Sequence, residues 1–399
     1  LSSTLVLIFQ IVHLFTPATL SLGILAGKTD NVLGSWNALG LFAGFSALLS
    51  LLVVEFFSIT RIEKYILGIL AVLSVALVAA VNFPLVWVLL GVSSLIIFVY
   101  KVSIRSKEVQ DEGDTEKKEV HFPIFSFSII MVTLLFFISG NFIGSIIPSR
   151  LGIQNNEVSP SFSATMLITK SVLKESPVFG IGPNKFGEAW AMYKPLVINS
   201  KINGNDFWNV AFNSGSGLLP TLISTTGYLG ILAWLVFFVL LIISGVKSIF
   251  SSIKNGVNWE TMAFFVLSLY LFVSAFFYST GPVIFLLAFA FAGIFIGLSA
   301  SHSKNGEIVM SFLNDHRKSF FSMLFIILLI IISAAASFKY LERFVSVPYF
   351  GKTLGAPNIP EAFTFINKAI TLNSNDLYLR TYAQVYLVKF DSLIKKGTS

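Results

Sequence analysis

The chain has 399 residues, of which 55% are hydrophobic and only 12% are charged, and its mean hydropathy is +0.82. Soluble domains carry about a quarter charged residues, so this composition excludes a soluble enzyme, a fibrous protein and a disordered linker. The net charge of +7 comes from Lys and Arg scattered over loops, which argues against nucleic-acid binding. The composition predicts an integral membrane protein of the all-α class.

Long apolar runs define the predicted membrane helices. A bilayer core of roughly 30 Å needs about 20 apolar residues per helix, and a helix satisfies its own backbone in lipid. Because the chain starts at Leu1 inside an apolar run, with no Met or basic region before it, we expect a trimmed chain rather than a signal peptide. Nine runs are long enough to span: 4–26, 36–57, 64–82, 83–101, 123–147, 228–247, 260–278, 283–301 and 320–338.

The positions of Lys and Arg predict the orientation. With the N-terminus inside, the inner loops carry twelve Lys and Arg, whereas the short outer connections carry only Lys28. We expect a multi-pass protein of the cytoplasmic (inner) membrane, with a charged cytoplasmic linker over 101–121. The predicted domains are five spans in 1–147, an outer loop over 148–227, four spans in 228–338 and an outer tail over 339–399.

The tail has its own pattern. An amphipathic helix is predicted over 361–372, followed by a turn at 373–376 and a second helix over 377–393. This pair resembles the second helix of one tetratricopeptide repeat and the first helix of the next. Since a solenoid core normally needs at least three repeats, the pair is expected to lean on the membrane domain or to continue further. Such a tail is a candidate site for a protein partner.

The outer loop begins with an amphipathic helix over 161–174, which we expect to lie flat at the outer interface. Pro177 ends that helix. Gly180 and Gly182 then predict a tight turn whose backbone a ligand could approach closely, the alternative being a turn that only reverses the chain. Farther along, 218–226 contains Pro220 and is predicted to be a half-inserted helix that runs into the sixth span.

Aromatic and short polar side chains lie between these two segments. Rings cover the apolar faces of sugars, and amides and carboxylates bind their hydroxyls, so this composition favours glycan recognition. An aromatic belt at the membrane surface is the alternative. The residues are Trp190, Tyr193, Lys194, Asn199, Asn203, Asn205, Asp206, Trp208, Asn209 and Asn213.

The stretches "ESPVFGIGPNKF" and "LISTTGYLGILAWL" resemble the large periplasmic loop of the O-antigen ligase and polymerase family, and the resemblance covers residues 123–247. Its specific positions are Pro177, Gly180, Gly182, Pro183, Gly227 and Gly230. Members are integral membrane glycosyltransferases of the C-type superfamily. The resemblance implies transfer of glycan from a polyprenyl-pyrophosphate carrier to an acceptor, such as the core of a lipopolysaccharide, in the synthesis of cell-envelope polysaccharide.

Two departures from the family pattern affect the expected chemistry. Family ligases carry a His in the outer loop at the position of Ser216, eleven residues before Gly227. No His is available on the outer loop here, because the four histidines are His13, His121, His302 and His316. The family also often has a basic residue just ahead of the amphipathic helix, where this chain has Val-Ser-Pro-Ser at 158–161 and Arg150 farther upstream.

The remaining polar residues supply the candidate site. Asp206 and Glu188 are the candidate bases for the acceptor hydroxyl. Cations must neutralise the leaving pyrophosphate, and the candidates are Arg150, Lys174, Lys185 and Lys194. Further substrate contacts are assigned to Gly180, Gly182, Trp190, Trp208 and Asn213, with no cofactor and no metal. For each Lys the alternative is a solvated loop charge, and for Asp206 a turn or cap residue.

Ionisable residues inside predicted spans are functional candidates by default. His13 is one, the alternative being a bond to a neighbouring backbone, and Glu55 is another, although it could snorkel to the cytoplasmic surface. Three hypotheses follow for the whole chain. These are a membrane glycosyltransferase, a non-catalytic relative that binds glycan or recruits partners, and a transporter. The transporter is the weakest, because we find no internal repeat and few intramembrane charges.

Overall fold

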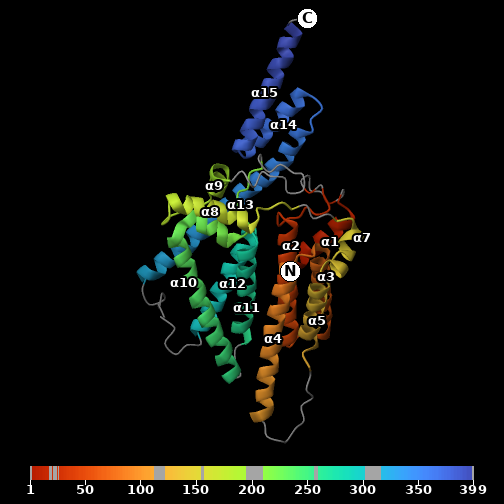
Figure 1. Cartoon of the computed structure of the whole chain (residues 1–399), viewed down its shortest axis with the longest axis vertical. Helices are drawn as coiled ribbons and strands as arrows, with labels where there is room; N and C mark the ends of the chain where they lie inside the picture. Colours follow the sequence, from red (N-terminus) through yellow and green to blue (C-terminus); the bar gives the residue numbers. More distant parts are fainter. Residues whose placement is uncertain are drawn as a thin grey trace. The chain divides into compact units, whose positions relative to one another are not determined.

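The computed structural model describes residues 2–17, 20, 25, 27–111, 122–153, 157–194, 210–255, 259–301 and 316–397. Every regular element in these ranges is an α-helix and no strand occurs among them, which confirms the all-α class (Figure 1). The chain divides into two compact units: unit 1 comprises residues 1–14 and 28–307, and unit 2 comprises residues 15–27 and 308–399. Each unit is described by itself.

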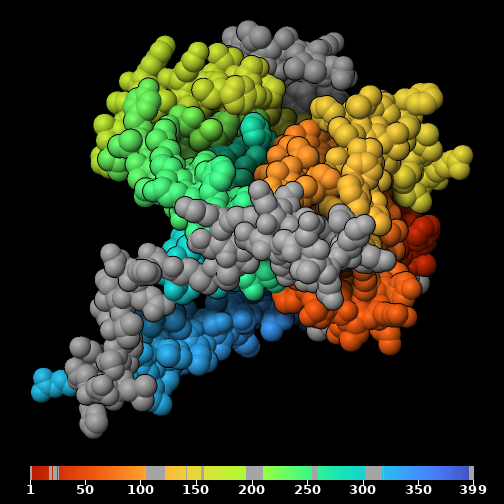
Figure 2. All heavy atoms as spheres, turned by 90° about the horizontal axis from the view of Figure 1, so that it is seen from below, coloured from red at the N-terminus to blue at the C-terminus, as the bar shows by residue number. Residues whose placement is uncertain are grey.

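Unit 1 contains the long helices that precede and follow the predicted outer loop (148–227) in the sequence. Its helices are α1 (Ser2–Phe15), α2 (Trp36–Phe56), α3 (Arg61–Val81), α4 (Pro84–Asp111), α5 (Ile124–Ser139), α6 (Asn141–Gly144), α7 (Ile146–Leu151), α8 (Phe162–Glu175), α9 (Phe186–Tyr193), α10 (Leu218–Asn255), α11 (Trp259–Phe277) and α12 (Pro282–Ser301). Within this unit, α7, α8 and α9 gather at one end of the long helices, and α4 and α10 finish at the other (Figure 1). Seen from that other end, α10 (green) and α3 to α5 (orange to yellow) form opposite sides of the unit (Figure 2).

Seven helices in the described ranges are long and apolar enough to cross a membrane, which supports a multi-pass membrane protein: Trp36–Phe56, Arg61–Val81, Pro84–Ile104, Leu218–Ile253, Trp259–Phe277, Pro282–Ser301 and Ser319–Leu354. They match seven of the nine predicted spans. The predicted span over 123–147 is instead a pair of helices, Ile124–Ser139 and Phe142–Leu151, that meet at 103° and would make an eighth span if they cross together. In the predicted span over 4–26, the described helix has only 14 residues, and much of the rest lies outside the described residues.

Helix α2 is at the centre of unit 1, with 72% of its most apolar window buried. A Cβ added at Gly40 would lie 2.7 Å from a methyl carbon of Val81, so α3 packs directly on the α2 backbone. On another side, the Tyr270 hydroxyl of α11 lies against Gly44 and donates to the Leu41 carbonyl at 2.9 Å. Small residues allow this close approach of membrane helices, where apolar burial alone does not drive association.

The two ionisable residues predicted inside spans are part of the packing of unit 1. One carboxylate oxygen of Glu55 accepts hydrogen bonds from the backbone N–H and the hydroxyl of Ser126, both at 3.3 Å, and so satisfies the first turn of α5. Lys101 donates to the Glu55 carbonyl and lies over the Phe56 ring. His13 is fully buried, and its ring stacks on Phe9 of α1.

Unit 2 contains α13 (His316–Leu354), α14 (Ile359–Leu372) and α15 (Asp376–Gly397). The helices predicted over 361–372 and 377–393 are confirmed by α14 and α15. Helix α13 contains the predicted span over 320–338 and continues through Pro348 to Leu354, so no helix end marks the predicted boundary at 339. The three helices enclose a small core formed by Ile366, Ala369 and Tyr378.

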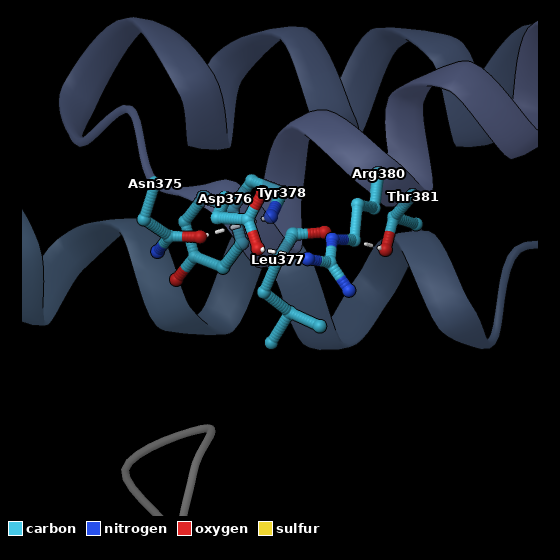
Figure 3. A network of polar contacts seen from close by, with 6 residues as sticks. All are labelled: Asn375, Asp376, Leu377, Tyr378, Arg380 and Thr381. Carbon is cyan, nitrogen blue, oxygen red and sulfur yellow. Dashed lines mark hydrogen bonds and ion pairs between the residues drawn. The ribbon is translucent and has the colours of Figure 1, made fainter. Parts of the chain in front are cut away.

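Capping residues define the turns of unit 2. Asn358 Oδ1 accepts from the Glu361 N–H at 2.9 Å at the start of α14, and Asn375 Oδ1 accepts from the Tyr378 N–H at 2.9 Å at the start of α15. Figure 3 shows the second of these turns, where Asp376 also pairs with Arg380 at 2.8 Å. Short polar caps of this kind satisfy the free N–H groups of a first turn.

Candidate functional site

The predicted amphipathic helix is confirmed as α8. Ser161 is its N-cap, and the Ser161 hydroxyl accepts from the Ala164 N–H at 3.1 Å. One face, with Thr165, Ile168, Thr169 and Val172, is buried against the rest of unit 1, and Lys170 and Lys174 are exposed. Helix α8 therefore packs on the rest of unit 1 by this face, whereas Phe162 and Leu167 are 65% and 48% exposed. That α8 lies flat at the outer interface stays a prediction.

The glycine turn that follows α8 docks into a break in α10. At Gly227 the backbone leaves the helical conformation, with φ of 65° and ψ of −164°. Four backbone hydrogen bonds then join the two segments: Ile181 N to Ser224 O (2.9 Å), Gly182 N to Thr225 O (3.0 Å), Tyr228 N to Pro177 O (2.9 Å) and Leu229 N to Val178 O (3.2 Å). In a continuous helix Ser224 and Thr225 would accept from residues 228 and 229. The turn thus takes the place of two bonds inside α10 and pairs the four backbone groups that those two bonds would have used.

Two glycines of the motif are required by this docking. A Cβ at Gly180 would overlap the carbonyl oxygen of Ser224, and one at Gly227 would overlap the carbonyl of Val178. Both residues also have φ of +65°, which favours glycine. The close approach that the sequence predicts at Gly180 is therefore made by the backbone of α10. At Gly182, with φ of +112°, the added Cβ would instead lie 3.3 Å from the Lys185 side chain.

Trp190 has a packing role that differs from the predicted one. Its side chain is 2% exposed, its indole N–H donates to the Val210 carbonyl at 3.0 Å, and Phe212 meets its ring edge-on at 4.8 Å. Together with Ile168 and Phe186 it forms a small core between α8 and α9. A ring enclosed in this way presents no open face to a sugar. Composition alone could not separate a buried aromatic residue from an exposed one.

A second glycine-rich turn, over 213–217, is held between three helices. The Thr165 hydroxyl of α8 accepts from the Ser216 N–H at 3.0 Å, and the Thr221 hydroxyl of α10 accepts from the Gly215 N–H at 2.9 Å. A Cβ at Gly217 would overlap the main chain of α11. Sequence reasoning did not assign a role to Thr165 or Thr221, and the closely spaced glycines of this turn were the only signal.

An apolar pocket of about 410 Å³ opens beside this turn. Helices α8, α10 and α11 all contribute to its walls, and its lining residues are Phe162, Ser216, Leu219, Pro220, Val273, Phe276 and Phe277. Of these residues, only Ser216 has a polar side chain. Ser216, the position at which the resemblance described above predicts a His, therefore lines the pocket.

The charged candidates are distributed over several elements. Lys185 and Glu188 form an ion pair at 3.6 Å next to the glycine turn, with side chains 52% and 57% exposed. Lys174 is exposed in the last turn of α8, and Lys194 directly follows α9. Arg150 belongs to α7, which packs on α3, whereas the glycine turn packs on α10. Of the predicted site residues, Gly180, Gly182, Lys185 and Glu188 thus lie together on one short segment, and Arg150 lies on a different element.

Three other predicted contacts complete the set. Asn213 is exposed, and its Oδ1 would lie 3.0 Å from a Cβ at Gly187. Asp206 and Trp208 lie outside the described residues. Within the described ranges no group of three or more His, Asp and Glu side chains could hold a metal ion.

No protein-family model matches the chain, and no curated protein matches it.

Proposed function

We propose that the chain is a membrane glycosyltransferase of the O-antigen ligase/polymerase type, which transfers glycan from a polyprenyl-pyrophosphate carrier to an acceptor at the outer face of the cytoplasmic membrane. The pocket beside Ser216 carries the proposal. Its volume of about 410 Å³ lies in the range of roughly 300–1,000 Å³ of small-molecule sites. Its apolar walls suit an isoprenoid chain, and polar loop segments adjoin it for the head group.

The charge distribution supports the proposed topology. With the Lys- and Arg-rich loops inside, the end of unit 1 that carries α7, α8 and α9 faces outward. A lipid-linked glycan presents its sugars on that side. The tail over 339–399 would then lie outside as well, where it could recruit a protein partner.

The proposed reaction is a single displacement. The acceptor hydroxyl oxygen bonds to the anomeric carbon of the glycan while the bond from that carbon to the pyrophosphate oxygen breaks, and the electron pair leaves with the polyprenyl pyrophosphate. The hydroxyl proton passes to a carboxylate, for which Glu188 and Asp206 are the candidates. Lys185, 3.6 Å from Glu188, would neutralise charge that builds on the leaving group.

A non-catalytic relative is the second candidate, and Ser216 favours it. The side chain that lines the pocket at this position is a hydroxyl, and it cannot accept a proton at neutral pH as an imidazole can. A protein of this kind would bind the same lipid-linked glycan and act as a scaffold. Binding and turnover therefore have to be measured separately.

Native mass spectrometry of the full chain in nanodiscs tests the proposal, with polyprenyl-pyrophosphate glycan as the probe. Leu219→Trp fills the pocket from α10, and we expect at least roughly tenfold weaker lipid binding. Leu232→Trp is the matched control, because Leu232 lies on the same helix, is 61% exposed and does not line the pocket.

The outcomes separate the two candidates. Binding that is lost in Leu219→Trp and retained in Leu232→Trp supports a lipid-linked donor site. Turnover with an acceptor then supports the transferase, and its absence with a range of acceptors supports the scaffold. If the wild type binds no more of the glycan lipid than of the membrane lipids around it, both readings of the site fail.

A further inference from the structure

A single carboxylate ties the segment ahead of α8 to two membrane helices. Glu157 Oε1 accepts from the Asn37 N–H at 3.1 Å, and Glu157 Oε2 accepts from the Asn37 side-chain amide at 2.7 Å. The hydroxyl of Tyr278, directly after α11, donates to the same Oε2 at 2.7 Å. Ser35, the N-cap of α2, lies 2.9 Å from that hydroxyl.

The neighbouring groups stabilise the hydrogen bonds of Glu157 to both Asn37 and Tyr278. Asn37 is in the first turn of α2, where backbone N–H groups have no partner inside the helix and a negative charge is stabilised. Burial raises the pKa of Tyr278 well above its ordinary value, so the phenol stays protonated and remains a donor. The Tyr278 ring also meets Phe83 edge-on at 5.3 Å, which fixes the direction of its hydroxyl.

Glu157 and Tyr278 are close in the sequence to residues that line the apolar pocket. Glu157 is five residues ahead of Phe162, and Tyr278 is the next residue after Phe277. Phe162 and Phe277 line the pocket from α8 and from α11, respectively. A hydrogen bond between Glu157 and Tyr278 therefore connects the chain segments that carry two of its walls.

We infer that Glu157 is a positioning residue for the pocket: its bond to Tyr278 holds the start of α8 at a set distance from the end of α11 and so fixes the width at which an apolar chain is bound. The role in substrate binding rests on the proposed function, whereas the clamp between the two helices does not. Sequence reasoning had no signal for it, because Glu157 and Tyr278 are 121 residues apart and meet only in the folded chain.

The chain contains a natural control for this bond. Tyr193 donates to Glu175 at 2.5 Å, and this pair has the same chemistry. It joins the end of α8 to α9, away from the residues that line the pocket. Removing the Tyr193 hydroxyl changes a Tyr–Glu hydrogen bond without touching the clamp.

Distances between two spin labels test the clamp without any substrate. The chain has no cysteine, so Ser163→Cys and Thr280→Cys supply the only label sites, one beside each wall and neither in the pocket lining. We expect a narrow distance distribution in this background and in Tyr193→Phe. Tyr278→Phe and Glu157→Ala should each broaden it, and the double variant should broaden it little further than Glu157→Ala alone, since that substitution already removes the bond that Tyr278→Phe removes.

Affinity for polyprenyl-pyrophosphate glycan supplies the second readout. Without the labels, Tyr278→Phe and Glu157→Ala should each weaken binding by roughly tenfold, the usual effect of a lost hydrogen bond to a charged group, while Leu232→Trp, which lies outside the pocket lining, binds as the wild type does. Unchanged label distances in both clamp variants overturn the inference. Broadened distances with unchanged affinity overturn the role in substrate positioning. If the wild type does not bind the lipid at all, the proposed function fails, and the labels still decide whether the clamp exists.

Discussion

Two contacts between helical segments are held by different groups. One is the backbone joint in unit 1, where the glycine turn (177–182) docks on α10. The other is the side-chain joint in unit 2, the α14–α15 hairpin. In the first, four backbone hydrogen bonds join residues 177–182 to residues 224–229. In the second, Tyr378 of α15 packs in one small core with Ile366 and Ala369 of α14, and a side-chain cap starts α15. A backbone joint demands glycine at defined positions, whereas a side-chain joint needs only apolar bulk and a short polar cap.

Gly227→Ala should have the largest effect. A Cβ there overlaps the carbonyl of Val178, and the φ of +65° is itself unfavourable for alanine. We expect a loss of stability on the order of 4 kcal/mol, because a steric overlap and an unfavourable backbone conformation act at the same residue. Thermal unfolding in nanodiscs measures the loss, and hydrogen exchange at Ile181 and Gly182 reports the joint itself.

Gly293→Ala is the matched control for that change. Gly293 lies within α12, and nothing lies within 4 Å of an added Cβ. Alanine is favoured over glycine in a helix by about 1 kcal/mol, so the control should be neutral or slightly stabilising. Equal melting temperatures for the two variants would show that the backbone joint does not hold the turn.

Tyr378→Ala tests the side-chain joint and should have the next largest effect. The Tyr378 side chain is 4% exposed, and removing a buried ring costs about 3 kcal/mol. Tyr378→Phe keeps the ring and loses only the contact with the Ser346 hydroxyl at 3.2 Å, which is worth about 1 kcal/mol or less. Limited proteolysis of the full chain, followed at α14 and α15, measures both. A Phe variant as sensitive as the Ala variant would contradict packing as the main contribution.

Asn375→Ala should have a smaller effect on the same hairpin. It removes the acceptor of the Tyr378 N–H at the start of α15 (Figure 3). Loss of an N-cap costs about 1 kcal/mol. Ser374→Ala, which changes the exposed neighbouring residue, is the control. Comparing the proteolysis rates of the two variants separates loss of the cap from a general effect of alanine in this turn. The cap is unimportant if the two variants are cleaved at the same rate.

The difference between the joints also explains which features the sequence could predict. A long apolar run was enough to predict α2 and α11, and an amphipathic pattern was enough to predict the tail helices. In each case the signal lies within one continuous stretch of sequence. Gly180 and Gly227 were each identified as special. Their pairing was not, since its hydrogen bonds connect positions more than 40 residues apart and no periodic pattern marks such a distance.

The candidate site was less predictable than the fold for the same reason. Trp190 and Lys185 were both chosen by residue type, yet one is enclosed in a core and the other is half exposed. Thr165 and Glu157 contribute through single contacts with distant segments, at Ser216 and Tyr278. Residue type limits the chemistry of a position, but only the packing decides whether a substrate can reach it.

Lys185→Ala distinguishes a role in the backbone joint from a role in substrate binding. We expect it to leave stability almost unchanged. Its ion pair with Glu188 is exposed on both sides, and such pairs contribute less than about 1 kcal/mol. Lys185 nevertheless directly follows the turn, and under the proposed function the loss of this cation should weaken binding of the glycan lipid by roughly tenfold. Lys170→Ala, an exposed lysine on α8, should change neither property. If Lys185→Ala lowers the melting temperature and spares lipid binding, Lys185 belongs to the joint, and the cation for the pyrophosphate must be sought at Lys174 or Lys194.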